Sequence, residues 1–267
     1  MEPPANLRKY GEAPFSVVLV HGGPGGAGEM APVCRRLALS GISSLEPLQT
    51  ELSVKGQLEE LKDSIVANAE LPVLLIGYSW GAWLSFLLAA EHPGLVKKLV
   101  LVSSGAFEEK YVKNLHASRM ARLTQEEKAE LDVLLAVLDD PAVDNKAAAF
   151  QRFGALFSKT DSFEPMEDAE KCVIEFRPDI YNAVWPEAAA MRKSGGLMKL
   201  CSKIKCPVVA LHGDSDPHSA DGVKLPLSMA LPCFKFITLD KCGHKPWIER
   251  YAAEHFYDVL GEEILRT

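Results

Sequence analysis

The sequence predicts an α/β protein with a mostly parallel β-sheet, helices on both faces and one helical insertion. Short apolar runs alternate with amphipathic helical patterns from about residue 15 to residue 105, and this alternation resumes near residue 206. Residues between about 105 and 200 show helical periodicity without a clear strand. We therefore expect a core formed by residues 1–105 and 203–267, with a helical cap at residues 106–202.

The N-terminal half of the chain contains most of the predicted sheet. Phe15–Val20 is almost continuously apolar, as expected of a strand buried on both faces. Leu58, Leu61 and Ile65 recur at the spacing of an amphipathic helix. We expect strands at residues 7–10, 15–20, 42–48, 73–76 and 96–102, and helices at 29–40, 57–68 and 82–90.

The remaining elements belong to the insertion and to the second part of the core. Thr124 and Glu127 form a capping-box pattern that opens a helix through Leu138, and Asp144 is a possible cap for another helix through Leu156. Beyond the insertion, strands are expected at residues 206–211 and 234–239, followed by a final amphipathic helix at 248–265.

Composition limits the classes of function. The net charge of −7 argues against nucleic acid as a main partner, and no apolar run is long enough to span a membrane. The N-terminus lacks the pattern of a signal peptide, and the six cysteines include no Cys-x-x-Cys pair. We expect a cytoplasmic protein with free thiols that acts on a small molecule without a metal or cofactor. The oligomeric state is left open.

One pentapeptide predicts a nucleophile. Gly77-Tyr78-Ser79-Trp80-Gly81 lies between a β-rich apolar run and a helix-forming apolar run. Gly-x-Ser-x-Gly in a strand–turn–helix context is typical of a nucleophile elbow, which exposes the serine hydroxyl at the top of a sheet. A plain Gly/Ser turn is the alternative.

Ser79, an acidic pair and His244 each follow a predicted strand, in the chain order serine, acid, histidine. A histidine can take the proton of the serine, and a carboxylate can orient that histidine. Asp216 lies three residues beyond Gly213 and is placed to reach a histidine loop, whereas Asp214 is better placed to brace the turn.

Two further interpretations concern the same loops. A metal site is the alternative use of the acidic pair, with ligands drawn from His212, Asp214, Asp216 and His218. An acyl-transfer intermediate needs backbone N–H donors, for which Trp80 and Gly23 are the candidates. The glycine-rich turn around Gly23 lacks the pattern of a P-loop or of a dinucleotide site.

At these residues the chain resembles the α/β-hydrolase superfamily. His21-Gly22-Gly23-Pro24-Gly25 together with Gly77-Tyr78-Ser79-Trp80-Gly81 is similar to the prolyl iminopeptidase-like branch, and Asp216 and His244 match its acid and base positions. Residues 45–50 depart from that branch, which has an acidic-arginine-glycine turn there.

The resemblance implies a serine hydrolase that cleaves a small ester or amide through an acyl-enzyme. A proline iminopeptidase, a C–C bond hydrolase or acyltransferase, and a non-catalytic ligand-binding protein are the alternatives on the same fold. Iminopeptidases bind the substrate amine with cap carboxylates, for which Glu164, Glu167, Glu170, Glu175 and Glu187 are available.

Candidates for substrate contact are aromatic. Tyr78, Trp185 and Phe153 are expected to contact substrate. An apolar roof over the site could also include Phe107, Phe150, Phe157 and Met191, although packing of the cap on the sheet explains most of these residues equally well.

Overall fold

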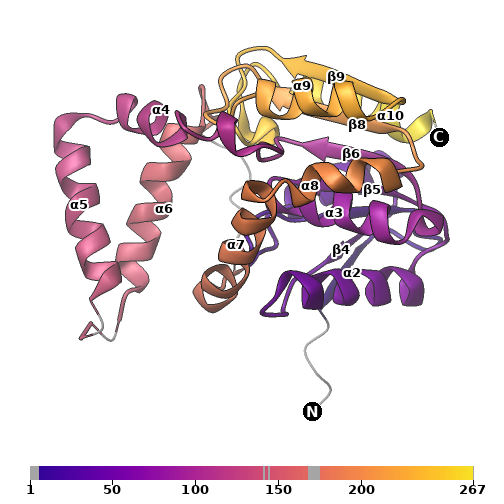
Figure 1. The fold of residues 1–267 in the computed structure, drawn as a ribbon, viewed down its shortest axis with the longest axis horizontal. Helices are drawn as coiled ribbons and strands as arrows, with labels where there is room; N and C mark the ends of the chain where they lie inside the picture. The colour runs from indigo at the N-terminus through magenta and orange to yellow at the C-terminus, as the bar shows by residue number, and fades with distance from the viewer. Residues whose placement is uncertain (1–5, 141, 144, 168–174, 267) are drawn as a thin grey trace.

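The computed structural model describes residues 6–140, 142–143, 145–167 and 175–266, and its centre is a seven-stranded sheet of order β1-β4-β2-β5-β6-β8-β9 (Figure 1). The pairs from β4 to β9 are parallel, and the edge strand β1 is antiparallel to β4. The strands of this sheet are β1 (Leu7–Tyr10), β2 (Val17–Val20), β4 (Ser44–Pro47), β5 (Val73–Tyr78), β6 (Val96–Val102), β8 (Val208–Gly213) and β9 (Phe234–Leu239). The expected α/β fold with a mostly parallel sheet is confirmed.

Helices cover both faces of the sheet because alternate strand residues point to opposite sides. Val18, Leu75 and Leu101 pack in one hydrophobic cluster, with α2 (Val54–Asn68), α3 (Trp80–Glu91), α8 (Gly196–Lys199) and α9 (Asp221–Ala230). Leu19, Ile76 and Val100 pack in the other cluster, with α1 (Ala31–Leu39) and α10 (Ala253–Leu265). The sheet is therefore buried on both faces.

The segment between β6 and β8 is mainly helical. It contains α4 (Leu115–Ala121), α5 (Gln125–Asp139), α6 (Ala147–Asp161) and α7 (Pro178–Lys193). In Figure 1, α4, α5 and α6 stand beside the sheet, with α5 and α6 lying along each other, while α7 lies nearer the core. Leu123, Leu131 and Leu156 form a small separate cluster within this segment. The capping box of Thr124 and Glu127 is present.

Several local features differ from the sequence prediction. A two-stranded antiparallel ribbon of β3 (Gly26–Ala27) and β7 (Glu175–Phe176) joins the glycine-rich turn to the helical segment. Helix α9 was not predicted, because a proline at position 226 interrupts its pattern. Lys146 precedes α6, and the predicted cap Asp144 lies outside the described residues.

Two findings bear on the compositional expectations. The five described cysteines, Cys34, Cys201, Cys206, Cys233 and Cys242, are free thiols. Across the part of the chain that the structure describes, every helix is too short or too polar to cross a lipid bilayer.

Close packing at the junction of β5 and α3 requires glycine. A Cβ atom on Gly77 would overlap the carbonyl oxygen of Gly81, and a Cβ atom on Gly81 would overlap the carbonyl oxygen of Val20. These neighbours are backbone atoms, so they cannot move aside as a side chain could. The junction can therefore hold β2, β5 and α3 together only while both positions lack a side chain.

We expect Gly81→Ala to destabilise the protein by about 1–3 kcal/mol, since the added methyl overpacks a backbone junction. The melting temperature should fall by on the order of 5 °C, measured by differential scanning calorimetry. Gly261→Ala is the matched control, because this half-buried position in α10 has open space where a Cβ atom would be added, and the stability of the variant should stay unchanged or rise. Equal melting temperatures for the two variants would contradict the packing argument.

Candidate active site

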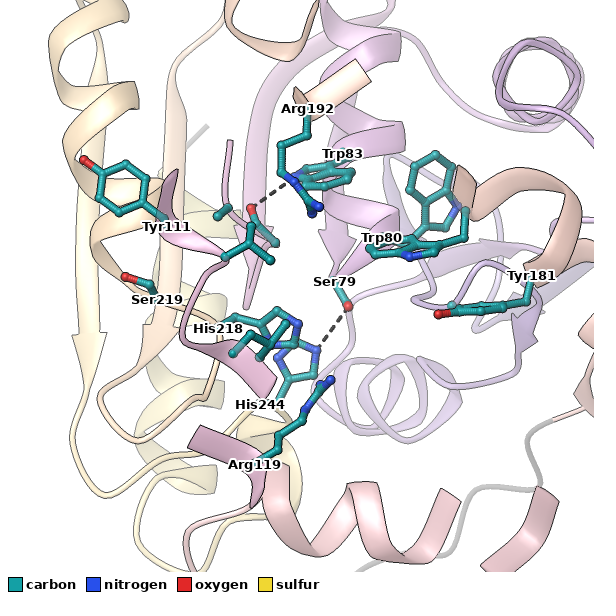
Figure 2. Close-up of a pocket in the computed structure, with 16 residues that line it drawn as sticks. Ser79, Trp80, Trp83, Tyr111, Arg119, Tyr181, Arg192, His218, Ser219 and His244 are labelled. Carbon is teal, nitrogen blue, oxygen red and sulfur yellow. Dashed lines mark hydrogen bonds between the residues drawn. The ribbon is translucent and has the colours of Figure 1, made fainter. Parts of the chain in front are cut away.

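Ser79 occupies the sharp turn between β5 and α3. Its backbone has φ 53° and ψ −115°, a conformation that non-glycine residues rarely adopt. The backbone N–H of Ser79 donates to the carbonyl of Val102 on the neighbouring strand, at 3.0 Å. The turn directs the Ser79 hydroxyl toward His244, with Oγ 3.1 Å from Nε2 (Figure 2).

The acid that faces the histidine is Asp216. Its Oδ2 lies 2.8 Å from His244 Nδ1, and both side chains are buried. Asp214 instead accepts hydrogen bonds from the Cys242 backbone N–H, at 3.1 Å, and from the Ser215 hydroxyl. Asp214 therefore braces the turn, and a continuous contact chain runs through Ser79, His244 and Asp216.

Two more imidazoles surround Asp216. The backbone N–H of His218 donates to Asp216 Oδ1 at 2.8 Å, and His218 Nδ1 lies 3.0 Å from the same oxygen. The His218 ring stacks on the His244 ring with centroids 4.4 Å apart. His212 Nε2 lies 2.9 Å from the His218 carbonyl and 3.4 Å from Asp216 Oδ2. Asp214 turns away, so the predicted set His212, Asp214, Asp216 and His218 is not assembled as a whole, whereas Asp216, His218 and His244 each place one potential metal-ligand atom within 4.8 Å of the others.

The Asp216 carboxylate controls the charge of the cluster. Burial alone would raise the pKa of Asp216, but the adjacent imidazoles of His244, His212 and His218 hold that pKa well below its ordinary value. Burial disfavours the His244 imidazolium, yet the charge and hydrogen bond of Asp216 outweigh it and raise the pKa of His244. Burial, followed by the charge of His244, lowers the pKa of His218. Of the stacked pair His244 and His218, His244 is therefore the imidazole that takes up a proton first.

Trp80, the residue after Ser79, is held by two glutamines. Its indole Nε1–H lies 3.0 Å from both Gln49 Oε1 and Gln57 Oε1. Gln49 also donates from Nε2 to the His21 carbonyl at 2.9 Å and from its backbone N–H to His21 Nε2 at 3.1 Å. Gln49 thus links the elbow to the glycine-rich turn, although residues 45–50 lack the turn expected from the resemblance.

A buried carboxylate organises the loop that carries His244. Glu249 Oε1 accepts from the backbone N–H groups of Gly243, at 3.0 Å, and Phe163, at 2.8 Å. Its Oε2 accepts from the backbone N–H of Glu164 at 2.8 Å. Glu249 is fully buried, so it joins the histidine loop firmly to the chain after α6.

The end of α6 also contacts both loops of the site. The His244 backbone N–H donates to the Asp161 carbonyl at 2.6 Å. Arg122 donates to the carbonyls of Thr160, at 2.6 Å, and Ser215, at 2.7 Å. The helical insertion is therefore attached directly to the segments that hold His244 and Asp216.

Two cavities meet at Ser79. The larger, of about 400 Å³, and the smaller, of about 240 Å³, share Gly23, Ser79 and His244 in their linings. The larger cavity is also lined by Trp80, Trp83, Gly105, Ala106, Tyr111, Val112, Leu115, Arg119, Tyr181, Trp185, Arg192, His218 and Ser219. The smaller cavity is also lined by Gly26, Glu29, Tyr78, Gly154, Phe157, Ser158, Asp161, Ser162, Phe176 and Lys245.

The three candidates for substrate contact have different surroundings. Trp185 lines the larger cavity, and Tyr78 lines the smaller one, with its ring between His244 and Trp247. Phe153 lines neither of these cavities and packs on Phe157 at the small cluster of the helical segment.

The other residues of the insertion that were candidates for the apolar roof or for amine binding also have different surroundings. Phe107 is fully buried against Phe86 in the core, and Met191 packs against the core cluster. The Phe150 side chain and Glu170 lie outside the described residues. Glu187 accepts from the Val54 backbone N–H at the start of α2, and Glu164 and Glu175 pair with arginines. Among the described residues, the cap glutamates predicted for amine binding line neither cavity.

Sequence reasoning missed His218, Gln49, Tyr181, Arg119 and Arg192. In the sequence His218 stands out only as a candidate metal ligand, although its position two residues after Asp216 is compatible with a contact with that carboxylate. The other four residues come from separate parts of the chain, and no local pattern marks them.

A parallel sheet with a serine, a histidine and a carboxylate in contact at its carboxyl edge defines an α/β protein with an enzyme-like site. The chain belongs to the Alpha/beta hydrolase family, whose sequence profile matches residues 17–254. The predicted superfamily is thereby confirmed.

Known relatives include esterases. The chain is 25% identical over 225 residues to a pimeloyl-[acyl-carrier protein] methyl ester esterase of Neisseria meningitidis serogroup A, a match that covers 79% of this chain and 65% of that protein. The match thus spans less than two thirds of that relative's length.

Solved structures share the fold. The crystal structure of VinJ superposes with a TM-score of 0.67 at 18% identity, covering 97% of this chain and 94% of that one. A proline iminopeptidase of Mycobacterium smegmatis gives a TM-score of 0.63 at 16% identity, also covering 97% and 94%. At these identities the likeness establishes the fold alone.

We expect NMR titration to give His244 a pKa above the ordinary value of 6.5. In Asp216→Asn that pKa should fall below 6.5, because burial still penalises the imidazolium while the opposing charge is gone. Asp214→Asn is the matched control and should leave the pKa of His244 above 6.5, since Asp214 faces the Cys242 backbone. The same titration curve in all three proteins would refute the assigned electrostatic role of Asp216.

Proposed function

We propose that the protein is a serine hydrolase that cleaves a small ester or amide through an acyl-enzyme. The observation that carries this proposal is the contact chain from Ser79 Oγ to His244 Nε2 and from His244 Nδ1 to Asp216. Ser79 is the nucleophile, His244 the general base and Asp216 the carboxylate that orients it.

In this mechanism His244 Nε2 takes the hydroxyl proton as Ser79 Oγ attacks the substrate carbonyl. The proton then passes from Nε2 to the leaving alcohol or amine as the bond to the carbonyl carbon breaks. A water molecule, with its proton taken by His244, then attacks the carbonyl carbon of the acyl-enzyme. The acid is released and the proton returns to Ser79 Oγ. The buried Asp216 carboxylate stabilises the imidazolium, which the raised pKa of His244 reflects.

Backbone N–H groups of Gly23 and Trp80 are proposed to stabilise the oxyanion. Both residues border the larger cavity beside Ser79, and Trp80 opens α3, whose N-terminal N–H groups are unpaired within the helix. The hydrogen bonds that the Trp80 indole donates to Gln49 and Gln57 hold its side chain, so the backbone at this position is well supported.

The surroundings of Ser79 favour an ester over a peptide N-terminus. A substrate amine needs an available carboxylate, and the two carboxylates that border the smaller cavity, Glu29 and Asp161, contact Lys245 and Arg119. The similarity to an esterase agrees with this preference. We also propose that residues 106–202 act as a cap over the site, because α4, α6 and α7 contribute lining residues to the two cavities.

We expect a fluorophosphonate probe to label the purified protein and to lose that labelling in Ser79→Ala. Hydrolysis of p-nitrophenyl esters should fall by on the order of 10³-fold or more, because the acyl-enzyme cannot form. Ser85→Ala is the control, since this serine follows the elbow in α3 but is fully buried, and labelling should persist. Equal labelling of Ser79→Ala and the parent protein would reject the mechanism.

A panel of substrates tests the kind of bond. The proposal expects turnover of esters and little release of naphthylamine from proline naphthylamide. Faster cleavage of the naphthylamide than of every ester would replace the esterase assignment with an aminopeptidase.

The pH profile follows from the required protonation state. Attack needs neutral His244, so kcat/KM should be full above the raised pKa of His244 and fall about tenfold per pH unit below it. The inflection of the kcat/KM profile should lie above pH 6.5. In Asp216→Asn the inflection should move below pH 6.5, and kcat/KM should be much lower throughout. An unchanged inflection in Asp216→Asn would contradict the coupling of these two groups.

A further inference from the structure

The two cavities at Ser79 differ in charge. The larger cavity is bordered by two guanidinium groups, Arg119 and Arg192, and no aspartate or glutamate is among its lining residues. The smaller cavity is bordered by Glu29, Asp161 and Lys245. A substrate that spans Ser79 would therefore place one part near cations and the other part near a mixed set of charges.

Arg192 belongs to a face of α7 that points toward the core and the larger cavity. Tyr181, Trp185, Ala188 and Arg192 recur at the spacing of one helix face. Trp185 stacks between the rings of Tyr181 and Trp83, with centroid distances of 6.0 Å to each. The Arg192 guanidinium lies 5.6 Å from the centroid of Trp83.

The contacts of Arg192 leave one side of its guanidinium available. Nε donates to Glu109 Oε2 at 2.8 Å, and among the described residues no protein acceptor receives a hydrogen bond from its two terminal amino groups. The Arg192 side chain is only 11% exposed, while Glu109 is about half exposed. Water therefore screens the Glu109 carboxylate more strongly than it screens Arg192.

More of the hydrogen-bond donors of Arg119 are already paired within the protein. Its Nε and Nη2 donate to the two carboxylate oxygens of Asp161, at 2.7 and 2.5 Å. In Figure 2, Arg192 reaches the cavity from the side of Trp83 and Arg119 from the side of His244. Among the described residues, both terminal amino groups of Arg192 lack a protein acceptor, whereas one of the two in Arg119 is paired with Asp161, so Arg192 is the better placed to receive a ligand.

We propose that the larger cavity binds a carboxylate of the substrate, with Arg192 as its receptor and the aromatic wall of Trp83, Trp185 and Tyr181 holding the apolar part. This proposal rests on the proposed hydrolase function. It specifies the substrate as an ester with a carboxylate attached to an apolar linker or ring. Two terminal N–H donors of a guanidinium match the two oxygens of a carboxylate.

A single negative charge fits the cavity better than a double one. Asp161 pairs with Arg119 through both carboxylate oxygens, whereas Glu109 meets only Nε of Arg192, so Arg192 can receive one added negative charge and a second would have no cation to meet. The aromatic stack meanwhile offers surface suited to a flat or extended apolar group. A monocarboxylate with an apolar body therefore satisfies both features.

Binding can be measured without turnover in the Ser79→Ala protein. We expect 3-phenylpropionate to quench tryptophan fluorescence at concentrations about 10- to 100-fold lower than its neutral isostere 3-phenylpropionamide. Adding Arg192→Gln should reduce that ratio to near one. Arg152→Gln is the matched control, because Arg152 pairs with Glu130 on the surface of the cap and lines neither cavity.

Turnover then shows which part of the substrate carries the carboxylate. One pair is mono-p-nitrophenyl glutarate and the corresponding glutaramate, where the charge lies on the acyl group. The other pair is 4-acetoxybenzoate and 4-acetoxybenzamide, where the charge lies on the leaving group. The parent enzyme should prefer the anion in one pair by about 10-fold or more, and Arg192→Gln should abolish that preference.

The outcomes separate this proposal from the proposed function. Hydrolysis of neutral esters with no Arg192-dependent preference for an anion, in binding or turnover, would overturn the carboxylate site alone. A carboxylate preference in binding, without hydrolysis of any ester, would uphold the site and reject the hydrolase. An equal loss for charged and neutral ligands with a lowered melting temperature would show that Arg192 only links α7 to Glu109, which also overturns the proposal.

Discussion

Backbone packs directly against backbone where the turn at Ser79 meets the neighbouring strand and helix, and this contact fixes the position of the candidate site. A side chain at position 77 would overlap the backbone of Gly81, and a side chain at position 81 would overlap the backbone of Val20, so both positions must be glycine. That proximity holds Ser79 in its positive-φ conformation and aims its hydroxyl out of the sheet. A strained serine of this kind persists only where the surrounding structure determines it fully.

The partners of Ser79 are held by buried carboxylates with separate tasks. Asp216 contacts His244 Nδ1 and, against the effect of burial, raises the pKa of that imidazole, whereas Glu249 accepts three backbone N–H groups, including that of Gly243 beside His244. Because two of those N–H groups belong to residues after α6, the helical insertion and the histidine loop share one anchor. Displacement of that end of α6 would disturb the geometry around His244, so motion of the proposed cap is expected to occur away from this anchor.

Much of the fold and part of the candidate site could be predicted from the sequence. The buried parallel strand β2 is apolar throughout and β6 is mostly apolar, and the capping box of α5 is a local pattern, so these elements could be predicted. Helix α9 was missed because Pro226 interrupts its pattern. Gln49 and Arg192 gave no local signal, since their roles come from contacts with Trp80 and Trp83, far away in the chain.

The elbow, the chain order serine, acid, histidine and the alternation that builds a parallel sheet can all be recognised in the amino-acid sequence. These are properties of neighbouring residues, because φ, side-chain size and apolar periodicity act over a few positions. The three-dimensional fold was needed to show that Asp216 meets His244 while Asp214 turns to the Cys242 backbone, and that Arg192 borders the cavity beside Ser79. Such choices depend on distances between segments that the fold brings together, and no periodicity along the chain encodes them.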